Sequence, residues 1–326
     1  MPYLSLVSDV LKSLEDFVSW DRYWDDEVLV SAIDATLPAQ PVRGVSGLAG
    51  RLHFPALPRV PKRAKHLWHL LTAGAHARLA FLWLWMRRGL GFVQPRTLDH
   101  ALLDHGLTLV LPGVESESIF TYGMCDGLHE GGVRGAIRVF NWGLPFPGGY
   151  FANLTRIDRN RRRAADIAAA ICDYQDAYPG RPVHLVAQSG GAGIAVFAAE
   201  ALPAERQIES IVLLGAALSP TYNLARAMAR TRRGLLNSYS TRDTFVLGWG
   251  TRVFGTTDRQ FTRAAGCVGF QMPPHLSDAD RALYDEKLTQ LPWMPEMAEA
   301  GRHYGGHVSC GCETHLTQHI APWMNR

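Results

Sequence analysis

From residue 101 to residue 326 the sequence predicts an α/β domain, built as a doubly wound, mostly parallel sheet with helices on both faces. Short, continuously apolar runs typical of buried strands recur along this part of the chain, and segments with helical spacing of apolar residues separate them. Because parallel strands need a crossover between them, this alternation indicates βαβ units. A hydrophobic content of 47% over 326 residues also supplies enough apolar surface for a substantial core.

Residues 1–100 are expected to form an N-terminal helical extension that precedes this domain. Apolar residues recur at helical spacing from Tyr3 to Trp20. The Pro- and Gly-containing stretch 37–61 indicates an irregular connection, and residues 62–94 are expected to be helical. The extension contains no motif that indicates chemistry.

The most apolar segment of the extension, residues 67–88, is the best candidate for membrane contact. Its uninterrupted apolar part, residues 79–86, is too short for a bilayer span, which takes about 20 apolar residues. We expect a helix packed on the protein. The alternative is a helix in a membrane interface, with its tryptophans at headgroup level and two arginines beside it.

The elements expected in the α/β domain follow one another in a regular order. The strands are 107–111, 136–142, 184–188, 208–215 and 235–240. The helices are 118–125, 160–178, 190–202, 224–233, 278–291 and 316–323, and Ser277 is the expected N-cap of the fifth. Residues 244–300 are otherwise less regular.

Charge and cysteine content limit the function classes. The 33 basic and 30 acidic residues leave a net charge of +3, which argues against a nucleic-acid partner. The first residues are charged where a secretory signal would be apolar, so a cytoplasmic location is expected, with peripheral membrane contact as the alternative. Five scattered cysteines do not resemble a disulfide framework, although Cys310 and Cys312 leave a local redox pair open.

The strand expected over residues 184–188 ends at Ser189, and small residues and an Ala-rich helical run follow. A serine on a tight strand-to-helix turn has a strained backbone, so the residues two before and two after it must be small. Ala187 and Gly191 meet this requirement. An ordinary glycine-rich turn is the alternative interpretation.

This Ala-x-Ser-x-Gly turn in its βαβ context resembles the nucleophile elbow of the α/β-hydrolase family, with alanine where glycine is usual. The resemblance covers about residues 105–326. It implies the chain order Ser, acid, His: Ser189 as nucleophile, Asp243 at a strand end as the acid, and His307 as the base. A histidine can take the proton of the serine, and a carboxylate fixes the tautomer of that histidine. The family needs no organic cofactor.

Two members of this set have competitors. Asp258 is the alternative acid, and Asp243 is preferred because it directly follows an apolar strand. His303 and His315 compete with His307, which is preferred because it follows two glycines in a loop with little crowding.

No metal is expected, although one arrangement resembles a zinc site. The pairs His303/His307 and His315/His319 have i,i+4 spacing and flank two cysteines. The glycines before His307 and the turn at Gly311 argue against a helical ligand pair.

The resemblance also implies an oxyanion hole and a pocket. Gly190 should donate one N–H, and Val114 the second, with Gly113 as the next candidate because Pro-Gly stands where the family commonly has His-Gly. Phe146 and Tyr150, from the aromatic loop 143–151, and Gln188 are expected to line a substrate pocket at the carboxyl edge of the sheet. The alternative is a loop packed on the core.

These residues predict a serine hydrolase that acts on a small-molecule ester or acyl substrate through an acyl-enzyme, most simply a carboxylesterase. An acyltransferase, a thioesterase or an amidase would use the same three residues, since pocket shape selects the leaving group. A catalytically silent, membrane-associated binding protein is the alternative from another class.

Overall fold

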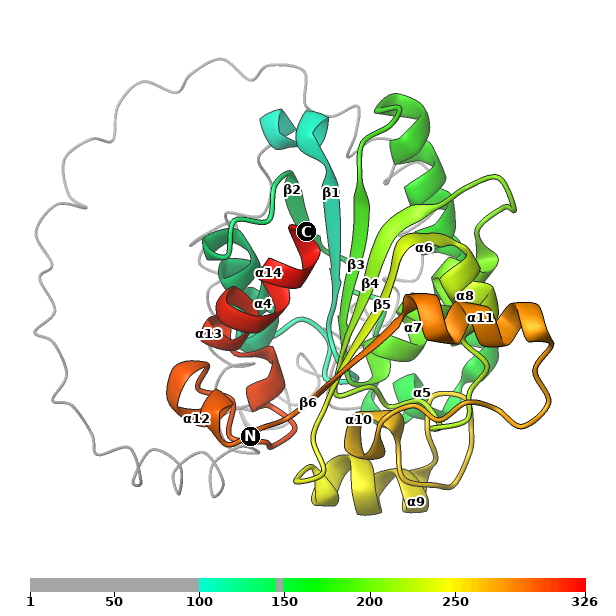
Figure 1. Ribbon diagram of the computed structural model, residues 1–326, viewed down its shortest axis with the longest axis vertical. Helices are drawn as coiled ribbons and strands as arrows, with labels where there is room; N and C mark the ends of the chain where they lie inside the picture. Colours follow the sequence, from blue (N-terminus) through cyan, green and yellow to red (C-terminus); the bar gives the residue numbers. More distant parts are fainter. Residues whose placement is uncertain (1–99, 145–148) are drawn as a thin grey trace, which may run out of the picture. The chain divides into compact units, whose positions relative to one another are not determined.

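The computed structural model describes residues 100–144 and 149–326, in which a six-stranded parallel sheet forms the centre (Figure 1). The strand order is β2-β1-β3-β4-β5-β6. The strands are β1 (Leu107–Leu111), β2 (Ala136–Val139), β3 (Val183–Gln188), β4 (Ile208–Leu214), β5 (Thr231–Tyr239) and β6 (Leu288–Pro292). All neighbouring strands pair in parallel, which confirms the predicted fold class.

Alternation of side chains along the strands builds a core on each face of the sheet. In β3, Leu185 and Ala187 belong to one apolar cluster, which also contains residues of α6 (Ile157–Ala177), α7 (Gly190–Ala201), α8 (Ala225–Ala229) and α11 (Asp278–Lys287). Val186, between them, belongs to a second cluster with α4 (Ile119–Glu130) and the C-terminal helices. Figure 1 shows these two sets of helices on opposite sides of the sheet.

The N-terminal extension expected over residues 1–100 lies outside the described residues, except for His100, which begins the short helix η2 (His100–His105). The candidate membrane segment 67–88 also lies outside them. Within the described ranges, no helix combines the length and the apolar character needed to cross a bilayer.

The helix α4 continues five residues beyond the predicted 118–125, through a stretch that was predicted to be a glycine-rich loop. Its Gly127 lies against the backbone of Glu313: a Cβ atom added there would lie 2.8 Å from the Glu313 Cα. The glycine therefore serves helix packing rather than a turn. Helix α5 (Gly149–Thr155) was not expected either, because it begins inside the aromatic loop predicted over residues 143–151.

The helix predicted over residues 224–233 is shorter, and β5 begins at Thr231. The Thr231 hydroxyl donates to the Met228 carbonyl at 2.7 Å and closes the turn between the two elements. Arg232 is exposed, whereas Arg233 reaches Glu209 on β4 at 3.5 Å. This alternation is typical of a strand with an ion pair to its neighbour.

The helix predicted over residues 278–291 ends at Lys287, and the residues that follow form β6 at the edge of the sheet. Ser277 caps α11 as predicted, since its hydroxyl accepts the Asp280 N–H at 3.1 Å. β6 contains no fully buried residue, which explains why the apolar pattern did not reveal it.

The remaining elements are short and lie between β5 and the end of the chain. They are the π-helical η3 (Thr244–Gly250), α9 (Thr251–Phe254), α10 (Ala265–Val268), α12 (Glu296–Ala300), the 3-10 helix η4 (Ser309–Gly311), α13 (Glu313–His315), the π-helical η5 (Leu316–Ile320) and α14 (Ala321–Met324). The last two contain the helix predicted over residues 316–323.

Candidate active site

Ser189 occupies a strained turn between β3 and α7. Its backbone has φ 54° and ψ −121°, a region that residues other than glycine rarely adopt. The surrounding backbone holds this geometry: the Ser189 N–H donates to Leu214 at 3.0 Å, and the Ser189 carbonyl accepts from Ala217 at 3.1 Å. The turn is therefore tied to β4 and to the segment that follows β4.

The small residues beside Ser189 allow the end of β1 to approach the turn closely. A Cβ atom at Gly191 would lie 2.8 Å from the Leu111 carbonyl oxygen, and one at Gly190 would lie 2.5 Å from the Val114 side chain. Ala187 is fully buried. A larger side chain at Gly191 would push the turn away from the end of β1, and one at Gly190 would push it away from the loop that follows β1.

The structure brings Ser189, His307 and Asp243 together in one hydrogen-bonded row. The Ser189 Oγ lies 2.9 Å from His307 Nε2, and His307 Nδ1 lies 2.6 Å from Asp243 Oδ2. The Asp243 side chain is 4% exposed and the His307 side chain 16% exposed, so bulk water screens this row weakly. Ser189 and His307 are 118 residues apart in the chain.

The carboxylates around His307 favour its charged form. Burial of the imidazole opposes protonation, but the charge and hydrogen bond of Asp243, together with the charge of Glu115, raise the pKa of His307 above 6.5. An imidazole in this position accepts a proton more readily than a free histidine does.

The three competitors for these roles have other partners. Asp258 accepts the N–H and the hydroxyl of Ser219 at 2.9 and 2.5 Å, and the hydroxyl of Thr256 at 2.6 Å. His303 contacts Ser309 at 2.9 Å, and His315 contacts Ser238 at 3.4 Å. In this structure Asp258 joins two loops, while His303 and His315 lie together in the interior with their ring centres 4.6 Å apart.

The Gln188 side chain is buried against the segment that carries His307. Its side-chain amide donates to the His307 carbonyl at 3.4 Å, and the Cys310 thiol donates to the same carbonyl at 2.9 Å. Cys310 and Cys312 are both free thiols. Across the described ranges, no group of three or more His, Cys, Asp or Glu residues is arranged to hold a metal ion.

The loop that carries the two candidate oxyanion donors, Gly113 and Val114, is fastened by buried polar side chains. The Trp142 indole donates to the Pro112 carbonyl at 2.8 Å. Asn153, on α5, donates to the Val114 carbonyl at 2.9 Å and accepts the Leu144 N–H at 2.8 Å. Since the Val114 side chain packs on Gly190, these bonds hold the loop beside the serine turn. Sequence reasoning missed Asn153, whose only signal was one amide within the apolar run of α5.

Glu115 is a second residue that sequence reasoning missed. Its carboxyl folds back over Gly113, where an added Cβ atom would lie 2.9 Å from the Glu115 Cδ. Burial raises the pKa of Glu115, while backbone N–H groups of the loop and the charge of His307 act in the opposite direction. A carboxyl therefore lies within electrostatic reach of the candidate base, from the loop that also carries the candidate oxyanion donors. An acidic residue two positions after Gly113 was the available signal.

Two residues of the predicted pocket cannot be placed at its wall. Phe146 lies outside the described residues. Tyr150 belongs to α5, but its side chain lies outside the described part of the structure. The aromatic pocket wall stays a prediction.

No protein-family model matches this sequence, and no curated protein matches it either. Among solved structures, the chain is similar to a Trichoderma reesei cutinase in complex with a phosphonate inhibitor, with 15% identity, a TM-score of 0.31, and coverage of 69% of this chain and 97% of that chain. It is also similar to the pyrethroid hydrolase PytH, with 13% identity, a TM-score of 0.33, and coverage of 68% and 97%. The resemblance to the α/β-hydrolase fold lies in the geometry of the chain itself: a parallel sheet with helices on both faces, and a serine on the strained turn between β3 and α7.

Proposed function

We propose that this protein is a serine hydrolase that cleaves carboxylic esters through an acyl-enzyme, with Ser189, His307 and Asp243 as its catalytic residues. One observation carries the proposal: the Ser189 hydroxyl stands on a strained turn, 2.9 Å from an imidazole that a buried carboxylate holds by its other nitrogen. A serine needs such a base because its hydroxyl is a weak nucleophile at neutral pH.

The first half of the reaction forms the acyl-enzyme. Ser189 Oγ attacks the carbonyl carbon of the ester while its proton passes to His307 Nε2. Asp243 keeps the Nδ1 proton of His307 in place and stabilises the imidazolium. When the tetrahedral intermediate collapses, the bond to the leaving alkoxide breaks and His307 returns the proton to it. The products of this half are an alcohol and an ester of Ser189.

The second half releases the acid. A water molecule gives a proton to His307 and attacks the acyl carbon, and His307 then protonates Ser189 as the carboxylic acid leaves. The oxyanion of each intermediate would accept N–H bonds from Gly190 and Val114. The contact between Val114 and Gly190 and the Asn153 bond to the Val114 carbonyl support this assignment.

Labelling with a fluorophosphonate probe tests the proposal at a single atom. The probe should label the full chain, and Ser189→Ala should abolish both labelling and hydrolysis of a short p-nitrophenyl ester. Ser210→Ala is the matched control, because Ser210 also bonds a histidine, His184, at 2.7 Å, but from the middle of a strand. Labelling that survives in Ser189→Ala would overturn the proposal, as would failure of the unmodified chain to react.

Ester hydrolysis is also separable from the related reactions. Thioesters, amides and esters share the steps up to the acyl-enzyme, and they differ in the group that leaves or accepts. A panel of the three substrate types, measured with and without an added alcohol or amine acceptor, should show free acid from esters as the fastest product. A faster thioester, amide or transfer reaction would reassign the activity and leave the catalytic residues unchanged.

A further inference from the structure

An apolar surface stands out on the helical run Thr244–Phe254, which begins directly after Asp243. Phe245, Trp249 and Val253 recur at every fourth residue and are 77%, 57% and 46% exposed. The rings of Phe245 and Trp249 stack with their centres 6.2 Å apart. Phe254 and Phe261 are also exposed. Contiguous exposed side chains of this size indicate an interaction site rather than scattered surface residues.

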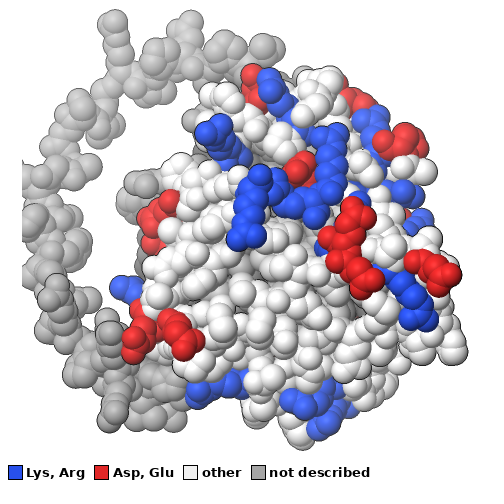
Figure 2. Space-filling view, in the orientation of Figure 1, with Lys and Arg blue, Asp and Glu red and all other residues white. Residues whose placement is uncertain are grey.

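Positive charge borders this apolar surface. Residues 244–276 contain Arg252, Arg259, Arg263 and a single acidic residue, Asp258, so three arginines minus one aspartate leave +2. Asp258 is occupied by Ser219 and Thr256, and within the described residues none of the three arginines forms an ion pair. In Figure 2, a group of Lys and Arg side chains lies at the lower edge, where Figure 1 shows α9 and α10, next to uncharged atoms.

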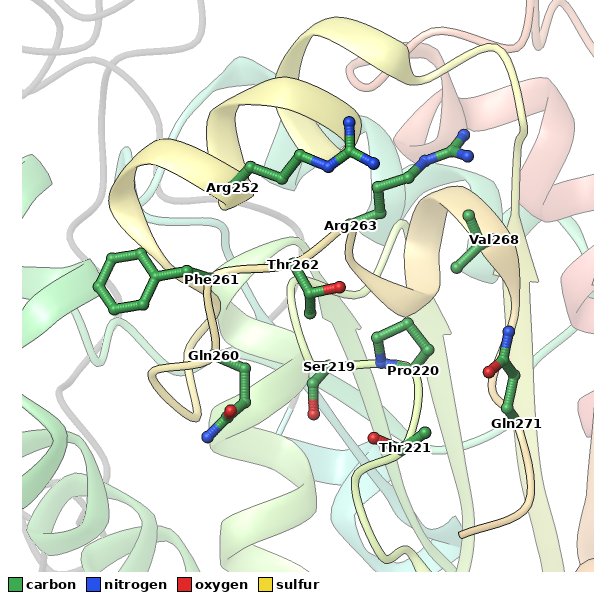
Figure 3. Close-up of a pocket in the computed structure, with 10 residues that line it drawn as sticks. All are labelled: Ser219, Pro220, Thr221, Arg252, Gln260, Phe261, Thr262, Arg263, Val268 and Gln271. Carbon is green, nitrogen blue, oxygen red and sulfur yellow. The ribbon is translucent and has the colours of Figure 1, made fainter. Parts of the chain in front are cut away.

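Two of the arginines line a hollow of about 490 Å³ beside the aromatic side chains. Arg252 and Arg263 extend toward the same side of it, and the Phe261 ring points away from them (Figure 3). The wall also carries neutral polar groups from Thr221, Gln260 and Gln271, and no carboxylate. Guanidinium groups and neutral donors without an acid fit a phosphate group.

We propose that residues 244–263, with the hollow between Arg252 and Arg263, dock this protein on membranes that contain anionic phospholipid. The aromatic side chains enter the interface between headgroups and acyl chains, and the arginines bind lipid phosphate. A helix with Trp and Phe on one side and arginines beside them matches that environment in both polarity and charge. The proposed surface consists of other residues than the candidate membrane segment 67–88, and its lipid binding does not depend on catalysis.

The docking surface is joined to the candidate active site through Asp243 and Leu247. The Asp243 carboxylate accepts the Leu247 N–H at 3.3 Å at the start of η3, and the buried Leu247 packs against Ala217 beneath the exposed residues. Docking would thus hold the carboxyl edge of the sheet next to the lipid surface. That consequence for lipid esters rests on the proposed function, whereas the binding itself does not.

Vesicle co-sedimentation of the full chain tests the proposal. The protein should bind vesicles of phosphatidylcholine and phosphatidylglycerol and should be released by high salt, because salt screens the arginines. Arg252→Gln/Arg263→Gln should weaken binding by roughly 25-fold, about fivefold for each charge. Phe245→Ser/Trp249→Ser should weaken it by at least about tenfold, since two exposed aromatic side chains lose their burial in the interface.

Two matched variants control for unspecific loss. Arg162→Gln removes an exposed arginine on α6, and Met294→Ser removes a side chain that is 46% exposed, as Val253 is. Both should bind like the unmodified chain, with the thermal midpoints of all variants similar. Ser189→Ala should also bind normally, which separates docking from catalysis.

Trp249 reports the depth of docking. The blue shift of tryptophan emission on vesicle addition should largely disappear in Trp249→Phe, while binding persists. The proposal is overturned if the protein does not bind vesicles, or if the double arginine variant and the double aromatic variant bind as tightly as the controls. It is also overturned if these two variants change the oligomeric state instead of the lipid binding. It is also overturned if inorganic phosphate protects the protein against unfolding while vesicles do not bind.

Discussion

Asp243 and Leu247 are linked by a hydrogen bond that fixes the orientation of the proposed catalytic acid. Asp243 Oδ1 accepts the Leu247 N–H at 3.3 Å, which leaves Oδ2 directed at His307 Nδ1. The start of a helix attracts a carboxylate because unpaired N–H groups point outward there. The carboxylate therefore holds its position even before a substrate binds.

Replacement of Asp243 by asparagine should separate its two contacts. The amide oxygen can still cap η3, but the amide nitrogen donates toward His307 and favours the wrong tautomer. We expect kcat for ester hydrolysis to fall by about 10⁴-fold, with little change in the thermal midpoint. Steady-state kinetics and thermal unfolding measure the two effects.

Asp258→Asn is the control for this substitution. Asp258 joins the Ser219 and Thr256 loops, so its loss should lower the thermal midpoint and leave kcat nearly unchanged. If Asp243→Asn kept full activity while Asp258→Asn lost it, the assignment of the acid would be reversed.

Glu115→Gln should shift the pH dependence of the reaction. The charge of Glu115 raises the pKa of His307, so its removal lets that pKa fall. His307 must be neutral to act as the base. The midpoint of the acid limb of the kcat/KM profile should therefore lie above pH 6.5 in the unmodified protein and should move to lower pH in Glu115→Gln. Asp126→Asn, on the exposed surface of α4, should leave the midpoint unchanged. A shift to higher pH in Glu115→Gln would contradict this prediction.

Asn153→Ala should slow the chemical step by releasing the loop that carries Val114. The buried amide bonds the Val114 carbonyl and both polar groups of the Leu144 backbone, and their loss should cost about 1–3 kcal/mol of stability. If Val114 supplies an oxyanion donor, we expect kcat to fall by up to about 100-fold with KM nearly constant. Asn237→Ala, at another fully buried amide, should lose stability without that fall in kcat. Equal kcat values in the two variants would show that Asn153 is only structural.

Three buried histidines should make the fold sensitive to acid. Burial, together with the charge of Arg233, lowers the pKa of His184 to about 4. Burial also lowers the pKa of His303 to about 4 and the pKa of His315 well below 6.5. Between pH 6.5 and about 4 the unfolded chain binds protons that the folded chain does not, so stability falls as the pH falls through this window. Each group adds a slope of at most about 1.4 kcal/mol per pH unit.

Urea unfolding at several pH values measures that slope. In His184→Gln, the dependence of the unfolding free energy on pH should be smaller by the contribution of one histidine. This holds whatever the substitution does to stability at neutral pH. An unchanged slope would mean that His184 is protonated in the folded protein. Ser210→Ala, which keeps the histidine, is the comparison.

The sequence predicted the elements that carry a strong apolar period, and it missed those determined by tertiary contacts. β1, β3 and β4 are buried on both faces, so their apolar runs were clear. The edge strand β6 alternates only weakly, and its pairing with β5 rather than its composition makes it a strand. α4 continues through Gly127 because the C-terminal segment packs there.

The candidate site divides in the same way. Chain order and the strand-to-helix turn were sufficient to name Ser189, Asp243 and His307, which the structure brings within hydrogen-bond distance. Glu115 and Asn153 could not be assigned, because their importance comes from what lies beside them: a buried imidazole in one case and a loop carbonyl in the other. Gln188 adjoins the serine in sequence, and its side-chain amide donates to the backbone carbonyl of His307.

The separation of 118 positions between Ser189 and His307 bears on the order in which the proposed catalytic residues are synthesised. Ser189 and the strands β1 to β5 are synthesised well before the His307 imidazole, so a growing chain that stops short of residue 307 carries the proposed nucleophile without its proposed base. The helices that follow His307 are in turn held on α4, since the Thr317 hydroxyl donates to the Gly127 carbonyl and the Asn325 amide donates to the Gly131 carbonyl. The proposed reactivity of the Ser189 hydroxyl should therefore arise only after residue 307 has been synthesised and the segment that carries it has packed beside the serine turn.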